Sequence, residues 1–283
     1  MNALEIAILK MKLSLGLTSQ SPIIRKVRPA YDALLRTVYG DRGVARSFHG
    51  EAPLFLRLEC RAISEEGDKG DGLSCAILKR LARPGGVVLD VGANIGVYSM
   101  LFARWGGSAG RVFAFEPAPS TLELLRAHLR LNQLEAQVEV VAQAVSDKVG
   151  EAVFYTHSFS GENSLNPVFS ARGDIASSVR VPVTTLDQFC QARNLAPTLI
   201  KIDVEGFELQ VLQGARETIL RHRPALVVEM HTHIWPDIKV RPEAMAALLG
   251  ELPYTVTPIE GQDPLREYGH VLLESRDVPP DRK

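Results

Sequence analysis

From residue 87 onward, short hydrophobic segments alternate with segments whose apolar residues recur at helical spacing. The short segments are rich in valine, isoleucine and leucine and have the length of strands. The segments predicted to be strands are 87–91, 111–117, 138–145, 198–204 and 224–231. Nearly continuous apolar strands separated by helices are typical of a parallel sheet with helices on both faces. The pattern therefore predicts an α/β fold for this part of the chain.

Local signals refine these elements. In the helix after the second strand, Ser120 is predicted to be the N-cap, and Glu123 completes a capping box. A single helix is predicted over 207–223, and an extra strand over 151–157, where the alternation would place a helix. The last predicted elements are a helix at 242–250 and strands at 254–260 and 270–275. Counting the last two strands, the main sheet is predicted to have seven strands.

The first quarter of the chain does not follow this alternation. It contains a predicted helix that ends at Gly40 and a predicted strand over 52–60, and a charged, glycine-rich loop follows at 65–72. We therefore place a boundary there. Residues 1–70 are interpreted as an N-terminal extension that caps the acceptor side of a site or contacts another subunit, and 71–283 as the main domain.

Composition narrows the classes of function. The net charge of −1 gives no general attraction to nucleic acid or to anionic membranes. The apolar N-terminal segment is interrupted by Glu5, Lys10 and Lys12 and lacks a cleavage site, so it does not fit a signal peptide or a membrane span. We expect an amphipathic helix there; peripheral membrane contact is the alternative.

The three cysteines, Cys60, Cys75 and Cys190, form no CxxC pair. This scatter argues against a disulfide framework and against a structural zinc site. It is typical of proteins from a reducing compartment. We therefore expect a cytoplasmic protein; its oligomeric state is left open by the sequence.

A glycine turn follows the first predicted strand, with the sequence Asp-Val-Gly-Ala-Asn-Ile-Gly. A dinucleotide site would have a glycine at the middle position, where this chain has Asn94, and the carboxylate of Asp90 would repel a pyrophosphate. The same acid favours the ammonium of S-adenosylmethionine, while helix N-terminal amides donate hydrogen bonds to its carboxylate. Asp90, Gly92, Asn94 and Gly96 are thus predicted to bind this cofactor; in the alternative, the glycines only permit tight packing.

Acids and polar residues at the next strand ends extend this prediction. Glu116 ends the second strand, where its two oxygens can accept from both ribose hydroxyls. Enzymes that use NAD also have an acid there, so Asp90 and Asn94, and not Glu116, distinguish the two cofactors. Ser146 and Asp147 end the third strand and are predicted to lie near the adenine.

Several of these segments together resemble the FkbM family of S-adenosylmethionine-dependent methyltransferases. The similar segments lie between residues 87 and 230 and are VLDVGANIGVYS, FAFEP, AVSD, TLDQF and IKIDVEGFELQVLQGA. The resemblance implies a Rossmann-like class I methyltransferase fold. It also implies O-methylation, because the better-known members act on hydroxyls of sugars or of polyketides and macrolides. The expected acceptor is a small-molecule or glycan hydroxyl, and no nucleic acid partner is expected.

Chemistry is predicted at the ends of the fourth and fifth strands. Asp203 ends one strand, while Glu229 and His231 are two residues apart on the next and point the same way. In one interpretation, His231 or an acid takes the proton of the acceptor hydroxyl. In a second, Asp203 and Glu229, with or without His231, hold Mg²⁺ or Mn²⁺. In a third, these are satisfied structural groups. Lys201 is expected to pair with Asp203.

Other polar residues nearby are given structural roles. Glu205 and Glu208 are expected to favour the start of a helix through its dipole. Trp235 is expected in the core or a lid, with stacking on a sugar as the alternative, and His233 in an exposed loop. The polar loop 160–167 either covers the acceptor or is a plain connection.

Three rival functions remain at this point. An RNA or protein methyltransferase would share the fold, but no Asn-Pro-Pro-Tyr type of amine site follows the fourth strand. A nicotinamide-dependent oxidoreductase conflicts with Asp90 and Asn94. A binding protein that lost catalysis conflicts with the acids at three strand ends. The sequence does not identify the acceptor.

Overall fold

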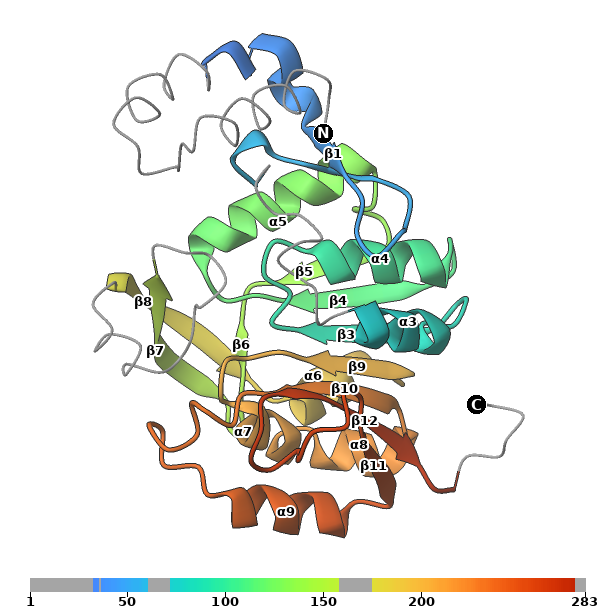
Figure 1. The fold of residues 1–283 in the computed structure, drawn as a ribbon, viewed down its shortest axis with the longest axis vertical. Helices are drawn as coiled ribbons and strands as arrows, with labels where there is room; N and C mark the ends of the chain where they lie inside the picture. The colour runs from blue at the N-terminus through green and yellow to red at the C-terminus, as the bar shows by residue number, and fades with distance from the viewer. Residues whose placement is uncertain (1–32, 36, 61–71, 158–174, 278–283) are drawn as a thin grey trace. The chain divides into compact units, whose positions relative to one another are not determined.

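The computed structural model describes residues 33–35, 37–60, 72–157 and 175–277 (Figure 1). The chain divides into two compact units, Met1–Lys69 and Gly70–Lys283. The N-terminal apolar segment and the loop 160–167 lie outside the described residues, so the predictions made for them stay predictions.

In the first unit, the described residues form a short helical stretch and a small hairpin. Residues 33–35 and 37–39 are helical, in agreement with the predicted helix. The later elements are η1 (Gly40–Arg42), β1 (Val44–Arg46), β2 (Leu54–Leu56) and η2 (Leu58–Cys60), with β1 and β2 antiparallel. The strand predicted over 52–60 is therefore too long. The role of this extension stays a prediction.

The second unit is built on a seven-stranded sheet with the order β11-β12-β10-β9-β3-β4-β5. Its strands are β3 (Val87–Val91), β4 (Arg111–Phe115), β5 (Val138–Val141), β9 (Leu199–Ile202), β10 (Ala225–Met230), β11 (Tyr254–Pro258) and β12 (Gly269–Ser275). Strands β5, β4, β3, β9 and β10 are parallel, and β12 runs antiparallel to β10 and β11. This confirms the predicted α/β class and the mostly parallel sheet of seven strands.

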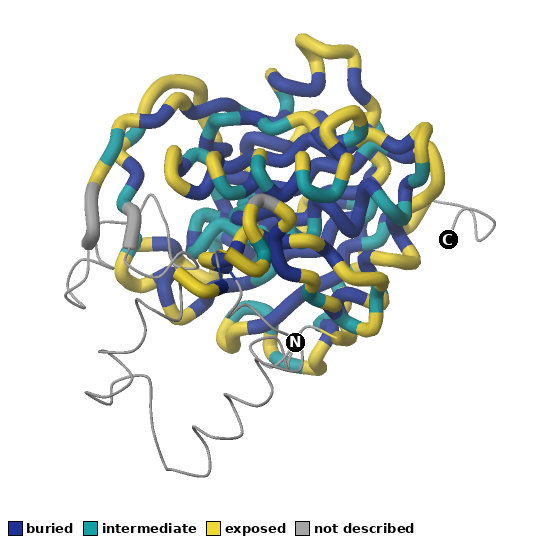
Figure 2. Tube along the Cα trace, turned by 90° about the horizontal axis from the view of Figure 1, so that it is seen from above, coloured by how far each residue is buried: buried dark blue, intermediate teal, exposed yellow. Residues whose placement is uncertain are grey.

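Helices pack against both faces of this sheet (Figure 1). They are α3 (Gly72–Leu81), α4 (Val97–Gly106), α5 (Pro119–Asn132), α6 (Leu186–Arg193), α7 (Glu208–Gln213), α8 (Arg216–His222) and α9 (Pro242–Glu251). Leu89 and Val91 of β3 join a large core cluster with residues of α6 to α9. Asp90 lies between them in the strand, so it faces the opposite side, where Ser99 of α4 contacts it. Most residues of the central strands β3, β4 and β9 are buried, and Figure 2 draws buried residues in dark blue.

Three predicted elements differ from the structure. Helix α5 begins at Pro119 with Ala118 as N-cap and no side-chain cap, so the capping box of Ser120 and Glu123 is wrong. Proline fits the first helical position because it has no N–H to satisfy. The helix predicted over 207–223 is interrupted between α7 and α8 around Gly214, where an added Cβ would lie 2.1 Å from the carbonyl oxygen of Ser146.

The third predicted strand also divides in two. Its second part, β6 (Ala144–Val145), leaves the main sheet and pairs with β8 (Ile175–Thr184). Strand β8 is antiparallel to β7 (Gly150–His157), which confirms the extra strand predicted over 151–157. This three-stranded sheet stands beside the carboxyl ends of the main strands, where it adds a wall to the site described below (Figure 1).

Two further sequence predictions concern the chain as a whole. Cys60, Cys75 and Cys190 are buried, and no disulfide joins them in the part of the chain that the structure describes. Within the described ranges, no helix has both the length and the apolar character that crossing a bilayer requires.

Candidate active site

The turn after β3 passes very close to the end of β9. Gly92 has φ of 84°, and its N–H donates to the carbonyl oxygen of Phe115 at 3.0 Å. A Cβ added to Gly92 would lie 1.7 Å from the carbonyl oxygen of Asp203. No other residue type fits there without moving one of the two segments. Gly96 is also required, because its φ is 89° and a Cβ would meet Leu125 at 2.2 Å.

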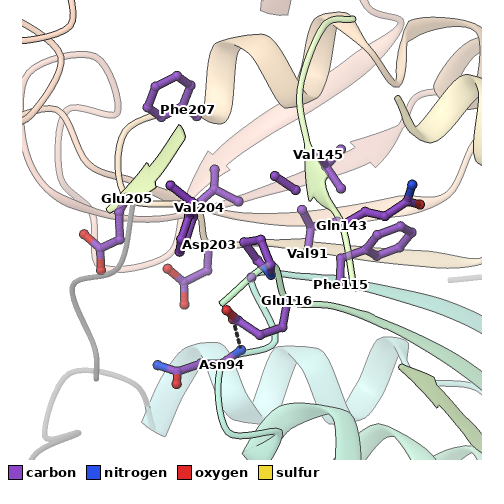
Figure 3. Close-up of a pocket in the computed structure, with 14 residues that line it drawn as sticks. Val91, Asn94, Phe115, Glu116, Gln143, Val145, Asp203, Val204, Glu205 and Phe207 are labelled. Atoms are coloured by element: carbon purple, nitrogen blue, oxygen red, sulfur yellow. Dashed lines mark hydrogen bonds between the residues drawn. The ribbon is translucent and has the colours of Figure 1, made fainter. Parts of the chain in front are cut away.

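Glu116 holds this turn from the end of β4. Its Oε2 accepts a hydrogen bond from the backbone N–H of Asn94 at 3.0 Å, which Figure 3 shows as a dashed line. Its Oε1 accepts from the N–H of Ala118 at 2.8 Å. Burial raises the pKa of Glu116 to about 7, against these two hydrogen bonds, which lower it. Each oxygen retains a second lone pair for another donor.

These residues surround a pocket, which we call the main pocket (Figure 3). It is lined by Val91, Gly92, Asn94, Phe115, Glu116, Pro117, Gln143, Ala144, Val145, Phe154, Asp203, Val204, Glu205 and Phe207. One side is apolar, with Val145 and Phe154 from the small sheet, and the other has the carboxylates of Glu116, Asp203 and Glu205. A flat apolar group and several hydroxyl groups could therefore be bound side by side.

Four of the residues predicted to bind the cofactor lie elsewhere. Asp90 is completely buried below the turn, and its Oδ2 accepts from Ser99 Oγ at 2.5 Å. Burial raises the pKa of Asp90, against the charge of Lys201. Gly96 packs against α5 and does not line the main pocket. Ser146 and Asp147 line a neighbouring pocket instead.

A cluster of four acids surrounds His231 at the ends of β9 and β10; we call it the acid–histidine cluster. His231 Nε2 lies 3.4 Å from Glu205, 3.7 Å from Glu229 and 4.0 Å from Asp203. His231 Nδ1 lies 2.8 Å from Glu208 Oε1. The structure thus brings together the three predicted catalytic residues, Asp203, Glu229 and His231, and adds two glutamates.

The acids decide the charge of His231. Burial alone would lower the pKa of His231, but the hydrogen bond to Glu208 and the charges of Glu208, Glu205 and Asp203 raise it to about 10. The imidazole is therefore a cation at neutral pH in this arrangement. It is 3% exposed and does not line the main pocket, whereas Asp203 and Glu205 do.

Glu205 and Asp203 hold their protons more tightly than ordinary carboxyls. Burial is the largest cause and raises the pKa of Glu205 to about 8, although the charge of His231 opposes it. Burial and the charge of Glu229 also raise the pKa of Asp203, against the charge of Lys201. The expected pair of Lys201 and Asp203 is present, with Nζ 3.1 Å from Oδ2. Basic carboxylates thus face the pocket.

Glu229 has a different environment from the other acids. Its Oε2 lies 3.5 Å from His270 Nε2, and Tyr268 donates a hydrogen bond to its Oε1. Burial would raise the pKa of Glu229, but His270, His231 and Lys201 outweigh it and lower this pKa well below the usual range. Glu229 is thus a weak base, and it does not line the main pocket.

Two aromatic predictions can be checked here. Trp235 is 1% exposed and donates to Glu208, so it belongs to the core and is not a stacking platform. His233 is exposed, as expected, and its ring lies near those of His231 and Tyr268.

The structure contains a group of residues that could hold a metal ion, but it is not the pair of Asp203 and Glu229 that was predicted. One ligand atom each from Asp203, Glu205 and His231 lie within 4.8 Å of one another. In the described part of the chain, Glu229 does not belong to such a group. Two carboxylates and an imidazole suit Mn²⁺ better than Mg²⁺, because Mg²⁺ prefers an all-oxygen shell.

Several residues that line the main pocket were not predicted from the sequence. Gln143, Val145 and Phe154 reach the main pocket only because β6 leaves the main sheet, which the apolar pattern does not show. Glu205 was expected to favour the start of a helix through its dipole, yet it precedes α7 and has φ of 51°. The glycine after it in Glu205-Gly206 was a turn signal that could have placed it in a loop.

Comparison with known proteins decides between the rival functions. The model of the methyltransferase FkbM domain matches residues 90–256, which is more than half of the chain. The chain belongs to the FkbM methyltransferase family. It is therefore a methyltransferase, and the seven-stranded sheet has the Rossmann-like class I architecture that the resemblance implied. The nicotinamide-dependent oxidoreductase is set aside.

Known methyltransferases match a large part of the chain. The 31-O-demethyl-FK506 methyltransferase FkbM of Streptomyces tacrolimicus is 32% identical over 210 residues, which are 65% of this chain and 77% of that protein. The hexuronic acid methyltransferase AglP of Haloferax volcanii is 28% identical over 158 residues, which are 53% of this chain and 58% of that protein.

A solved structure, the methyltransferase FkbM from Methylobacillus flagellatus, is 21% identical, with a TM-score of 0.46. The match covers 72% of this chain and 52% of that one, so this chain spans about half the length of that protein. Because the chain belongs to the FkbM methyltransferase family, its methyl donor is S-adenosylmethionine. The chemistry of the main pocket is compatible with this molecule. Glu116 offers acceptors for ribose hydroxyls, and Val145 and Phe154 offer an apolar wall for adenine.

Proposed function

We propose that this protein transfers a methyl group from S-adenosylmethionine to a hydroxyl of a sugar, a glycan or a polyketide-like natural product. The observation that carries the proposal is the pair of carboxylates, Asp203 and Glu205, at the edge of the main pocket with His231 behind them. An alcohol needs such a base because its proton must leave as the methyl group arrives. The names of relatives that act on FK506 and on a hexuronic acid support this acceptor class.

The cofactor is proposed to lie along the turn after β3. Glu116 would accept from the ribose hydroxyls through its remaining lone pairs, and Val145 and Phe154 would contact the adenine. The turn of Gly92 and Asn94 would lie against the methionine part. When bound, S-adenosylmethionine supplies an electrophilic methyl group on its sulfonium. Asp90 would act only indirectly, by fixing α4 through Ser99.

The proton of the acceptor hydroxyl is proposed to pass to Glu205 or Asp203. His231 does not line the pocket, so its proposed role changes from direct base to a buried cation that orients these two carboxylates. The raised pKa of Glu205, about 8, makes it a stronger base than an ordinary glutamate once it is ionised. Glu229 would help to hold His231 and would not accept the proton. Much of the rate would come from positioning the two reactants.

In a second form of the same proposal, a divalent cation activates the acceptor hydroxyl. Asp203, Glu205 and His231 would hold it, and it would lower the pKa of the acceptor hydroxyl. If the metal form is correct, turnover falls at least about tenfold after EDTA treatment and returns with Mn²⁺. Turnover that is insensitive to EDTA supports the carboxylate as the base.

The test of this function is a methyl-transfer screen with radiolabelled S-adenosylmethionine and the full chain. The acceptors are methyl glycosides, uronic acids and macrolide alcohols, with RNA and a protein mixture as the competing classes. We expect label on a hydroxyl compound, and loss of most of it in Asp203→Asn and Glu205→Gln. Glu243→Gln, on the exposed first turn of α9, is the matched control. Label on RNA or protein alone would contradict the proposal.

A further inference from the structure

Glu208 is the acid of the cluster that the mechanism above does not use. It is 0% exposed and does not line the main pocket. It contacts Nδ1 of His231, whereas the carboxylates of the pocket lie near Nε2 of the same ring. Its position is therefore suited to control the ring from the other nitrogen.

Three N–H groups converge on the Glu208 carboxylate. The backbone N–H of Gly206 donates to Oε1 at 2.8 Å, and Trp235 Nε1 donates to Oε2 at 2.8 Å. His231 Nδ1 lies 2.8 Å from Oε1. An ionised carboxylate is an acceptor only, so it satisfies all three groups when Nδ1 carries a proton. These hydrogen bonds to both oxygens offset the free-energy cost of burying the carboxylate.

This arrangement sets the direction of the imidazole ring. With Nδ1 bound to Glu208, Nε2 is turned to Glu205, Glu229 and Asp203 at 3.4, 3.7 and 4.0 Å. Trp235 is itself completely enclosed, so it fixes the Glu208 carboxylate from the core side. A carboxylate that orients a histidine through its second nitrogen is a common support for reactive centres.

We propose that Glu208 is a positioning residue for methyl transfer. It keeps the proton on Nδ1 of His231 and holds the ring so that Nε2 faces the two carboxylates of the main pocket. The role in catalysis rests on the proposed function, whereas the effect on His231 is a property of the folded chain alone.

Glutamine at position 208 gives a sharp test because it has a single acceptor oxygen. In Glu208→Gln the side-chain NH₂ group replaces one of the two acceptor oxygens. This NH₂ group then faces another donor, which is either Trp235 or the pair of Gly206 and His231. The double variant with Trp235→Phe removes the indole donor, so the oxygen can return to Gly206 and His231. Trp235→Phe alone leaves the Glu208–His231 contact in place and is the matched control.

The first measurement is nitrogen NMR of the full chain with ¹⁵N-labelled histidine, with His231 assigned from its loss in His231→Asn. We expect the protonated Nδ1 signal in wild type and Trp235→Phe, its change in Glu208→Gln, and its recovery in the double variant. Unchanged His231 signals in a folded Glu208→Gln protein overturn the proposal.

The second measurement is turnover with the acceptor from the screen. We expect kcat to fall about tenfold or more in Glu208→Gln and to recover partly in the double variant, while affinity for S-adenosylhomocysteine stays within about twofold. If kcat among these variants changes in parallel with their thermal stability and not with the Nδ1 signal, the positioning role is overturned. If the wild-type protein methylates no hydroxyl compound, the proposed function fails. The NMR result still decides whether Glu208 orients the His231 ring and keeps the proton on Nδ1.

Discussion

At the scale of single residues, burial next to other acids gives Glu205 its chemical character. Its pKa is about 8, because burial outweighs the attraction of His231. The sequence shows an acid after a strand but not how deeply it is buried. Asp203, Glu229 and His231 could be predicted together because strand ends meet at one edge of a parallel sheet. Glu208 could not, because it lies in a helix and not at a strand end, and the sequence does not show that its side chain turns toward His231.

The pH dependence of turnover tests the role of Glu205. A base must be ionised to accept a proton, so we expect the wild-type rate to rise as the pH increases through about 8. In Glu205→Gln this rise disappears and the rate falls about tenfold or more, in the range usual for general bases. Glu243→Gln should keep the wild-type profile. A profile of Glu205→Gln that still rises through the same range would assign the base to another group.

At the scale of elements, apolar periodicity predicted the strands well and the breaks poorly. The strands 87–91 and 111–117 correspond closely to β3 and β4, since both are continuous apolar runs. The break between α7 and α8 was missed, because Gly214 is required by its contact with Ser146, which is far along the chain. The transfer of β6 to the small sheet was missed for the same reason. Local patterns do not contain such long-range contacts.

The contact between the β3 turn and β9 gives a prediction at this scale. Gly92→Ala places a Cβ 1.7 Å from a backbone oxygen, so β3 and β9 must separate at the main pocket. We expect a loss of about 2 kcal/mol or more in the free energy of unfolding, measured with urea, and weaker cofactor binding.

Gly261→Ala is the control for this substitution. Gly261 also has a positive φ, of 80°, but its added Cβ would meet nothing within 4 Å. In Gly261→Ala the free energy of unfolding should fall only by the backbone strain, about 1–2 kcal/mol, and the affinity for the cofactor should not change. Equal losses of affinity in the two variants would contradict the special role of the Gly92 turn.

At the scale of the whole molecule, the order of the seven strands and the family membership both indicate a class I methyltransferase. Neither of them identifies the acceptor. The net charge of −1 still predicts a partner other than nucleic acid. Gly92, Asn94 and Glu116, which the sequence predicted to lie at the cofactor, do line the main pocket. Asp90 was also predicted there, but its side chain contacts Ser99 and does not line the pocket. The sequence shows how near Asp90 is to the turn, but it does not show on which face of β3 the side chain lies.

The most direct test of the account is calorimetric titration of the full chain with S-adenosylhomocysteine and, separately, with NADH. We expect S-adenosylhomocysteine alone to bind, and Glu116→Ala to weaken this binding about tenfold or more, since the ribose hydroxyls lose their acceptor. Binding of NADH alone, or normal affinity for S-adenosylhomocysteine in Glu116→Ala, would contradict the placement of the cofactor in the main pocket.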